Sequence, residues 1–98
     1  MRVRFFATIR NLTGCAETEI SSKETAGALA RSLCELYGEA LRKKVFPNGE
    51  QDMKPGEEKF GPEIIILING RHVNHLGGSA ASLKSDDLVD IFPLVAGG

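Results

Sequence analysis

The 98-residue chain contains no tryptophan, two cysteines and no long apolar run. No stretch approaches the ~20 consecutive apolar residues that span a bilayer, so no membrane-spanning segment is expected. Cys15 and Cys34 lie far apart and form no Cys-x-x-Cys pair, which favours reduced structural thiols over a redox or zinc site. The formal net charge of −1 provides no long-range field that would attract nucleic acid or an acidic membrane.

The sequence also lacks the motifs of a self-contained enzyme. It has no Gly-x-x-x-x-Gly-Lys phosphate-binding loop, and no serine, cysteine or lysine has an evident activating partner. His72 and His75 are three residues apart on an expected strand, which would place them on opposite faces and prevent them from sharing a metal ion. We therefore expect neither a bound cofactor nor a metal site.

The chain opens on an alternating pattern rather than a targeting signal. Met1 leads directly into "RVRFFATIR", which lacks the apolar block of a signal peptide, so a cytoplasmic protein is expected. Apolar side chains at every second position predict a strand over residues 2–10. A turn at 11–14 and a short strand at 16–20 would complete a β-hairpin.

After residue 20 the apolar side chains recur at helical spacing, which predicts one main amphipathic helix. Thr25 offers an N-cap for this helix, and Ser21 with Glu24 offers a competing capping box. Gly38 is placed to end or interrupt the helix, although "EALRKKVF" is compatible with two further turns.

The second half of the chain predicts a loop and three strands. Residues 44–62 are polar and rich in glycine and proline, which is typical of a long exposed loop. The apolar run 64–68 predicts a central strand, and Asn69–Gly70 predicts a tight turn into a returning strand over 71–76. A last strand is expected over 88–92.

This order of elements predicts an α+β roll. A mixed sheet of four or five strands would pack on one main helix. We expect one domain over residues 1–93, followed by an extended tail over residues 94–98.

The last strand has apolar side chains on both faces. Val89 and Ile91 alternate with Leu88, Asp90 and Phe92. One set would pack in the core, and the other would form a surface for a partner.

The chain ends in "FPLVAGG". Proline is expected to end sheet pairing, so the residues from Pro93 onward would leave as a tail that reaches about 20 Å. Gly97 and Gly98 have no Cβ and could thread a narrow channel, which would present a bare terminal carboxylate for attack on phosphorus. Leu94 and Val95 would anchor the base of the tail. The alternative is a frayed terminus without a role.

Three segments resemble the MoaD/ThiS sulfur-carrier family, whose members have the ubiquitin-like β-grasp fold. The segments are "VRFFATIR", "ILINGRHV" and "LKSDDLVDIFPLVAGG". The resemblance covers the whole chain except the loop at 44–62, which is longer than in the shortest members. Two departures are Leu94, where molybdopterin-type members often have a second proline, and Asp86–Asp87, where they often have Gly-Asp.

The resemblance implies a reaction at Gly98. An E1-like adenylating enzyme would activate the Gly98 carboxylate with ATP, and a sulfur donor would convert it to a thiocarboxylate. In the molybdopterin branch, the tail would then enter the large subunit of molybdopterin synthase and donate the sulfur. The chain would be the non-catalytic small subunit, with Gly97 at the reacting end. The partner-binding residues would be Phe92, Pro93, Leu94, Val95 and Ala96.

Other functions share the same ending. The chain could be a ubiquitin-like modifier that is joined through Gly98 to lysines of other proteins, or a carrier for thiamine synthesis or tRNA thiolation. A β-grasp interaction module without terminal chemistry is the remaining alternative.

Overall fold

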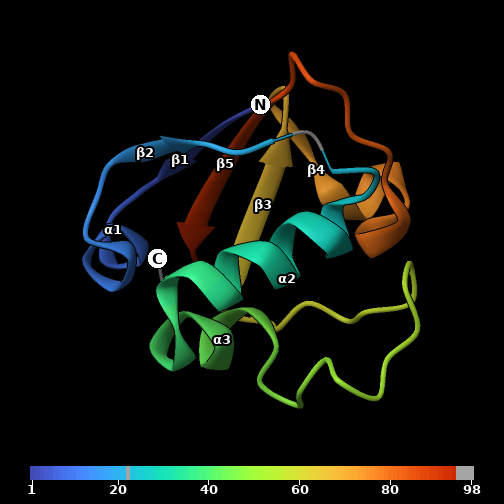
Figure 1. Cartoon of the computed structure of the whole chain (residues 1–98), viewed down its shortest axis with the longest axis horizontal. Coiled ribbons are helices and arrows are strands. Elements are labelled where there is room, and N and C mark those ends of the chain that lie inside the picture. The colour runs from blue at the N-terminus through green and yellow to red at the C-terminus, as the bar shows by residue number, and fades with distance from the viewer. Residues whose placement is uncertain (22, 95–98) are drawn as a thin grey trace.

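The computed structural model describes residues 1–21 and 23–94. A five-stranded mixed sheet, in the order β2-β1-β5-β3-β4, is covered on one face by helix α2 (Figure 1). Strand β1 runs parallel to β5, and the other pairs are antiparallel. The mixed sheet on one main helix confirms the predicted architecture. The elements are β1 (Arg2–Phe5), α1 (Thr8–Thr13), β2 (Glu17–Glu19), α2 (Ala26–Tyr37), α3 (Glu39–Val45), β3 (Ile64–Ile68), β4 (Arg71–His72), the 3₁₀ turns η1 (Val73–Leu76) and η2 (Gly78–Ala80), and β5 (Leu88–Pro93).

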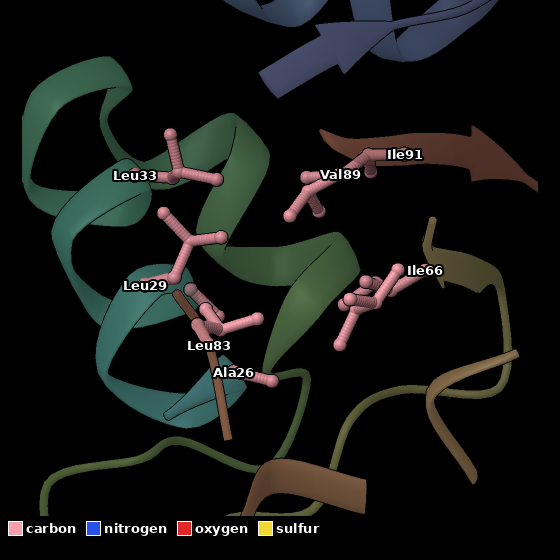
Figure 2. A pocket seen from close by; sticks show the side chains of 9 residues that line it. Ala26, Leu29, Leu33, Ile66, Leu83, Val89 and Ile91 are labelled. Atoms are coloured by element: carbon pink, nitrogen blue, oxygen red, sulfur yellow. The ribbon is translucent and has the colours of Figure 1, made fainter. Parts of the chain in front are cut away.

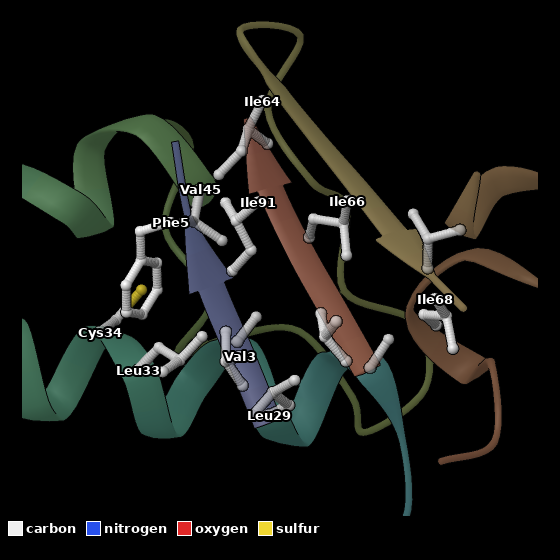
Figure 3. Close-up of a cluster of buried hydrophobic side chains, with 14 of the residues drawn as sticks. Val3, Phe5, Leu29, Leu33, Cys34, Val45, Ile64, Ile66, Ile68 and Ile91 are labelled. Atoms are coloured by element: carbon white, nitrogen blue, oxygen red, sulfur yellow. The ribbon is translucent and has the colours of Figure 1, made fainter. Parts of the chain in front are cut away.

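The core lies between α2 and the sheet (Figure 3). Leu29 and Leu33 of α2 pack toward Val3 of β1 and Ile91 of β5, and all four are almost fully buried. The helix begins at the cap Thr25, whose Oγ1 accepts the N–H of Ala28 at 3.1 Å. The helix therefore begins at Thr25 and not at the competing Ser21–Glu24 capping box. Among the described helices, none is long and apolar enough to cross a membrane.

The packing between α2 and the sheet leaves a gap of about 10 Å³, lined by apolar side chains of α2, β3 and β5 and by Leu83 (Figure 2). A cavity needs roughly 10–15 Å³ to hold one water molecule. The gap is therefore a packing defect rather than a ligand site.

The opening hairpin differs from the prediction, because β1 ends at Phe5 and helix α1 follows. The backbone of Ala7 has φ 52° and ψ −130°, a conformation that turns the chain out of the strand. The alternating pattern predicted a strand through residue 10 because a continuing strand would bury Ile9. Helix α1 buries the same side chain, so the pattern could not distinguish the two structures.

The returning strand expected over 71–76 is also shorter than predicted. Only Arg71–His72 pair with β3, and the 3₁₀ turn η1 follows. The rings of His72 and His75 are 5.9 Å apart between centroids, so the expectation that they lie on opposite faces is wrong. However, His72 Nδ1 accepts the N–H of Asn74 at 3.1 Å, which occupies its lone pair. In the part of the chain that the structure describes, no three His, Cys, Asp or Glu residues form a metal-binding cluster.

The segment between α3 and β3 was expected to be an exposed loop, but two of its carboxylates are buried. Glu58 Oε2 accepts from Arg31 Nε at 2.7 Å, and Glu50 pairs with Arg42 at 2.9 Å. Gly27 on α2 leaves the space for Glu58, because a Cβ at this position would collide with the Glu58 carboxylate. The loop is thus fastened to the helices by buried ion pairs, which a polar composition does not reveal.

Candidate functional site: the root of the C-terminal tail

The tail leaves the fold from the central strand of the sheet. Strand β5 lies between β1 and β3, and Ile64 of β3 pairs with Pro93 at its end. The N–H of Leu94 donates to the carbonyl of Glu63 at 2.8 Å, one position beyond Pro93. The prediction that Pro93 ends all sheet pairing is therefore wrong on this side of the strand.

On the other side of β5, the proline does end the ladder. The N–H of Phe6 donates to the carbonyl of Ile91 at 3.1 Å. In a parallel ladder the next bond would need an N–H from Pro93, which proline lacks. The root of the tail is consequently paired with β3 alone.

The predicted tail residues divide between described and undescribed positions. Phe92 and Pro93 belong to β5, and the Leu94 side chain is exposed. Val95, Ala96, Gly97 and Gly98 lie outside the described residues, so their roles remain predictions from the sequence. These four residues include Gly98, whose carboxylate is the predicted reacting group.

A stacked aromatic pair lies beside the root of the tail. The rings of Phe6 and Phe92 are 4.3 Å apart between centroids and nearly parallel, at 8°. Both are half-buried, whereas Val89 and Ile91 on the opposite face of β5 are buried against α2. This confirms the predicted alternation of β5. Phe92 therefore lies on the sheet face that α2 does not cover.

An ion pair adjoins the aromatic pair on the same face. Arg4 donates from Nε and Nη2 to the two carboxylate oxygens of Asp90, at 2.6 and 2.8 Å. The hydrogen bond with Asp90 raises the pKa of Arg4. The Arg4 guanidinium also lies 5.5 Å from the centroid of the Phe6 ring. We call the Phe6–Phe92 pair and Arg4, together with the exposed Leu94 two residues after Phe92, the root surface.

Arg4 and Phe6 were not predicted as site residues, although the alternation of residues 2–10 placed both on the face away from the core. The missing information was the pairing of β1 with β5, which joins Arg4 to Asp90 across 86 positions of the chain. A strand pairing between the two ends of a chain leaves no local signal in the sequence.

The thiols of the described region are structural. Burial raises the pKa of the Cys34 thiol to about 12, so it stays protonated in the core. Cys15 Sγ lies 3.4 Å from the hydroxyl of Tyr37, and burial, together with this hydrogen bond, raises the pKa of Tyr37. Cys34 is therefore not an activated nucleophile.

Comparisons with known proteins agree on the family. Residues 3–98 match the ThiS family. The chain is 35% identical over 100 residues to small archaeal modifier protein 3 of Haloferax volcanii, an alignment that covers all of this chain and 98% of the relative.

Solved structures show the same fold. Small archaeal modifier protein 1 from Methanosarcina acetivorans superposes with a TM-score of 0.81 at 33% identity, over 99% of this chain and 94% of that one. A Pyrococcus furiosus protein described as molybdopterin converting factor, subunit 1, superposes with a TM-score of 0.69 at 28% identity, over 96% and 95% of the two chains. The chain with this aromatic root surface and Gly-Gly ending therefore belongs to the ThiS family of ubiquitin-like sulfur carriers, with their β-grasp fold.

Proposed function

We propose that the chain carries sulfur on the carboxyl group of Gly98. The observation that supports this proposal is the position of the root: Leu94, 55% exposed, directly follows the central strand, two residues after Phe92 of the stacked pair. A terminal segment is thereby presented next to a surface suited to a partner, and the partner supplies the catalytic groups.

The proposed activation proceeds in two steps. A Gly98 carboxylate oxygen attacks the α-phosphorus of ATP in the active site of an E1-like enzyme, and pyrophosphate leaves. A hydrosulfide equivalent from a sulfur donor then attacks the carbonyl carbon of the adenylate, and AMP leaves, which yields the thiocarboxylate. ATP is bound by the partner, and this chain needs no cofactor of its own.

The E1-like enzyme would dock on the root surface. Aromatic and arginine side chains supply most of the energetically important contacts at protein interfaces. Phe6, Phe92 and Arg4 provide these residue types, and the ion pair with Asp90 holds Arg4 in place. Pro93 and Leu94 would lie at the mouth of the channel that receives the tail.

We propose the molybdopterin pathway as the destination of the sulfur, with this chain as the small subunit of molybdopterin synthase. The support is the likeness to molybdopterin converting factor, subunit 1, at 28% identity. The large synthase subunit would then bind the same root surface after activation.

A second candidate is conjugation to lysines of other proteins. It is favoured by the relatives named small archaeal modifier proteins, at 35% and 33% identity. Both candidates require the same adenylate at Gly98 and differ in whether sulfur or a lysine amine attacks it.

Mass spectrometry of the chain purified from its own host separates the two candidates. Replacement of one carboxylate oxygen by sulfur at Gly98 is expected for the carrier, and branched peptides that join Gly98 to lysine are expected for the modifier. Absence of both products in cells that express the E1-like enzyme would contradict the proposal.

A variant with one residue added after Gly98 tests the activation step. The addition moves the reacting carboxylate by roughly 3.5 Å, and a misplacement of about 1 Å can already cost ~100-fold in rate. We expect ATP–pyrophosphate exchange by the E1-like enzyme to be lost and the melting temperature to stay unchanged. Exchange at the wild-type rate would exclude both the carrier and the modifier.

A further inference from the structure

One asparagine ties the turn between β3 and β4 to the start of β5. The backbone N–H of Asn69 donates to the carbonyl of Leu88 at 2.8 Å, and Asn69 Oδ1 accepts the N–H of Leu88 at 3.0 Å. Asn69 Nδ2 donates to Asp87 Oδ1 at 2.9 Å. Both ends of the side-chain amide are therefore held, although the residue itself is exposed to water.

The acceptor of this amide is fixed as well. Asp87 is largely buried, and its Oδ2 accepts the N–H of Lys84 at 2.7 Å. The hydrogen bonds from the Lys84 N–H and from Asn69 lower the pKa of Asp87, so at neutral pH its carboxylate can only accept. The contact thus needs a donor at position 69, which an asparagine amide provides and an aspartate does not.

Asn69 is followed by Gly70, and an Asn-Gly pair can lose the side-chain amide without an enzyme. Glycine has no Cβ, so the backbone nitrogen of Gly70 is open to approach by the Asn69 side chain. This nitrogen loses its proton and forms a bond to Asn69 Cγ, the Cγ–Nδ2 bond breaks, and ammonia leaves with the proton. Water then opens the resulting cyclic imide at either carbonyl, which leaves aspartate or isoaspartate at position 69.

We propose that Asn69 is a modification site that the folded turn protects and the opened turn exposes. Attack makes Asn69 Cγ tetrahedral, which moves Oδ1 and Nδ2 away from the positions in which they bond to Leu88 and Asp87. These bonds must therefore break before the reaction can proceed. Once the turn opens, the amide reacts as it would in an unfolded chain. The proposal is independent of the reaction at Gly98.

Either product prevents the turn from closing as before. Aspartate at position 69 replaces the donor with a second carboxylate, about 2.9 Å from Asp87 Oδ1, where like charges repel each other. Isoaspartate adds one carbon to the backbone of the turn and disturbs the register in which Ile68 pairs with Arg71. The modification would thus mark chains that have opened and would hinder their refolding.

A second Asn-Gly pair provides an internal control. Asn48 and Gly49 are exposed in the segment between α3 and β3, and Gly49 has φ 82°, compared with 83° for Gly70. The contacts with Asp87 and Leu88 hold Asn69 and not Asn48. A difference between the two sites therefore reports these contacts.

The test is peptide mapping by mass spectrometry of the full chain after incubation at one pH and temperature, in native buffer and in urea above the unfolding midpoint. In urea, the two sites should react at similar rates. In native buffer, the rate at Asn69 should fall about tenfold or more, because only the open population reacts, and it should fall further than the rate at Asn48. An unchanged rate at Asn69, or an equal fall at both sites, would overturn the proposal.

Exchanging the donor and the acceptor tests the consequence of the modification. Asn69→Asp mimics one product, and adding Asp87→Asn moves the amide to position 87. There its oxygen can accept the Lys84 N–H and its nitrogen can donate to the new carboxylate, which accepts the Leu88 N–H. We expect Asn69→Asp to lower the urea midpoint and the double substitution to recover most of the loss. Asn74→Asp, at an exposed position of η1, controls for the added charge. A double variant no more stable than Asn69→Asp, or an equal loss in Asn74→Asp, would contradict the proposal.

Discussion

Arg4 and Asp90 lie side by side on neighbouring parallel strands and are joined by two hydrogen bonds, of 2.6 and 2.8 Å. The Asp90 side chain is only 11% exposed, whereas that of Arg4 is 42% exposed. The arginine therefore neutralises a carboxylate that the sheet largely shields from water, and at the same time it presents a cation on the root surface.

We expect Arg4→Ala to lower the urea midpoint of unfolding more than the double substitution Arg4→Ala with Asp90→Ala. The single substitution leaves a poorly hydrated carboxylate without its partner, and the double substitution removes that carboxylate as well. Equilibrium unfolding of the two variants checks this. If the double variant is less stable by the sum of the two single effects, the pair is not coupled.

Phe92→Asp should weaken binding of the E1-like enzyme more than it weakens the fold. Loss of the stacked pair with Phe6 removes about 0.5–1.5 kcal/mol of aromatic interaction from the fold. An aromatic residue at the centre of an interface contributes about 2 kcal/mol or more, which corresponds to roughly 30-fold in Kd. Calorimetric titration and urea unfolding measure the two effects, with Phe92→Leu as an apolar control. A greater loss of folding than of binding would make Phe92 a core residue.

Ala7→Gly should stabilise the fold by about 1 kcal/mol. Ala7 has φ 52° and ψ −130°, a region that glycine enters at much lower cost. Gly14→Ala is the reverse test. Gly14 has φ 77°, and a Cβ there would meet no atom within 4 Å, so this substitution reports backbone strain alone. It should destabilise the fold by about 1 kcal/mol. Thermal or urea unfolding of both variants gives the answer; effects of the same sign would contradict the strain assigned to Ala7.

The ion pair of the loop predicts how stability depends on pH. Burial alone would raise the pKa of Glu58, but hydrogen bonds from Arg31 and the Gly56 N–H outweigh it and lower this pKa below the ordinary value of 4.5. The native state therefore favours the ionised carboxylate. Its contribution to stability is complete above about pH 4.5 and is lost as the pH falls through the lowered pKa.

Glu58→Gln should make the unfolding free energy less dependent on pH below about pH 4.5. Some dependence remains, because hydrogen bonds from the Lys84 N–H and Asn69 lower the pKa of Asp87. Glu57→Gln removes the same charge from an exposed neighbouring position and serves as the control. If the two variants have the same pH dependence, Glu58 does not contribute in this way.

The periodic part of the fold was predictable from the sequence. Alternation placed Val3 and Phe5 in the core, and it placed Val89 and Ile91 on the opposite face from Phe92. These residues obey one period within one element, so local spacing suffices.

The alternating pattern predicted the wrong element where a strand and a helical turn would bury the same side chain. Ile9 is buried on α1, and Val73 is buried on η1, at positions where strands would also have buried them. The prediction of an exposed loop over 44–62 failed for a different reason. From the sequence, Glu50 and Glu58 are typical surface residues, and only the structure shows that arginines of α3 and α2 pair with them in the interior. The loop is consequently expected to contribute to stability through its buried ion pairs.

Part of the candidate site was predictable from local sequence, and part depended on strand pairing. Phe92 was identified from its own strand, whereas Phe6 joins it through a pairing between the two ends of the chain. Leu94 was predicted as an apolar anchor, but its backbone is what the sheet holds, and backbone hydrogen bonding depends on register rather than residue type.

The central strand of the sheet, β5, is also the last of its five strands in chain order. Strand β5 separates β1 from β3, so the β1–β2 pair and the β3–β4 pair cannot join into one sheet during synthesis until β5 arrives between them. A product truncated before residue 88 would lack this strand and expose the apolar sides of both halves. Chains that end before residue 88 would therefore stay incompletely folded and open to degradation.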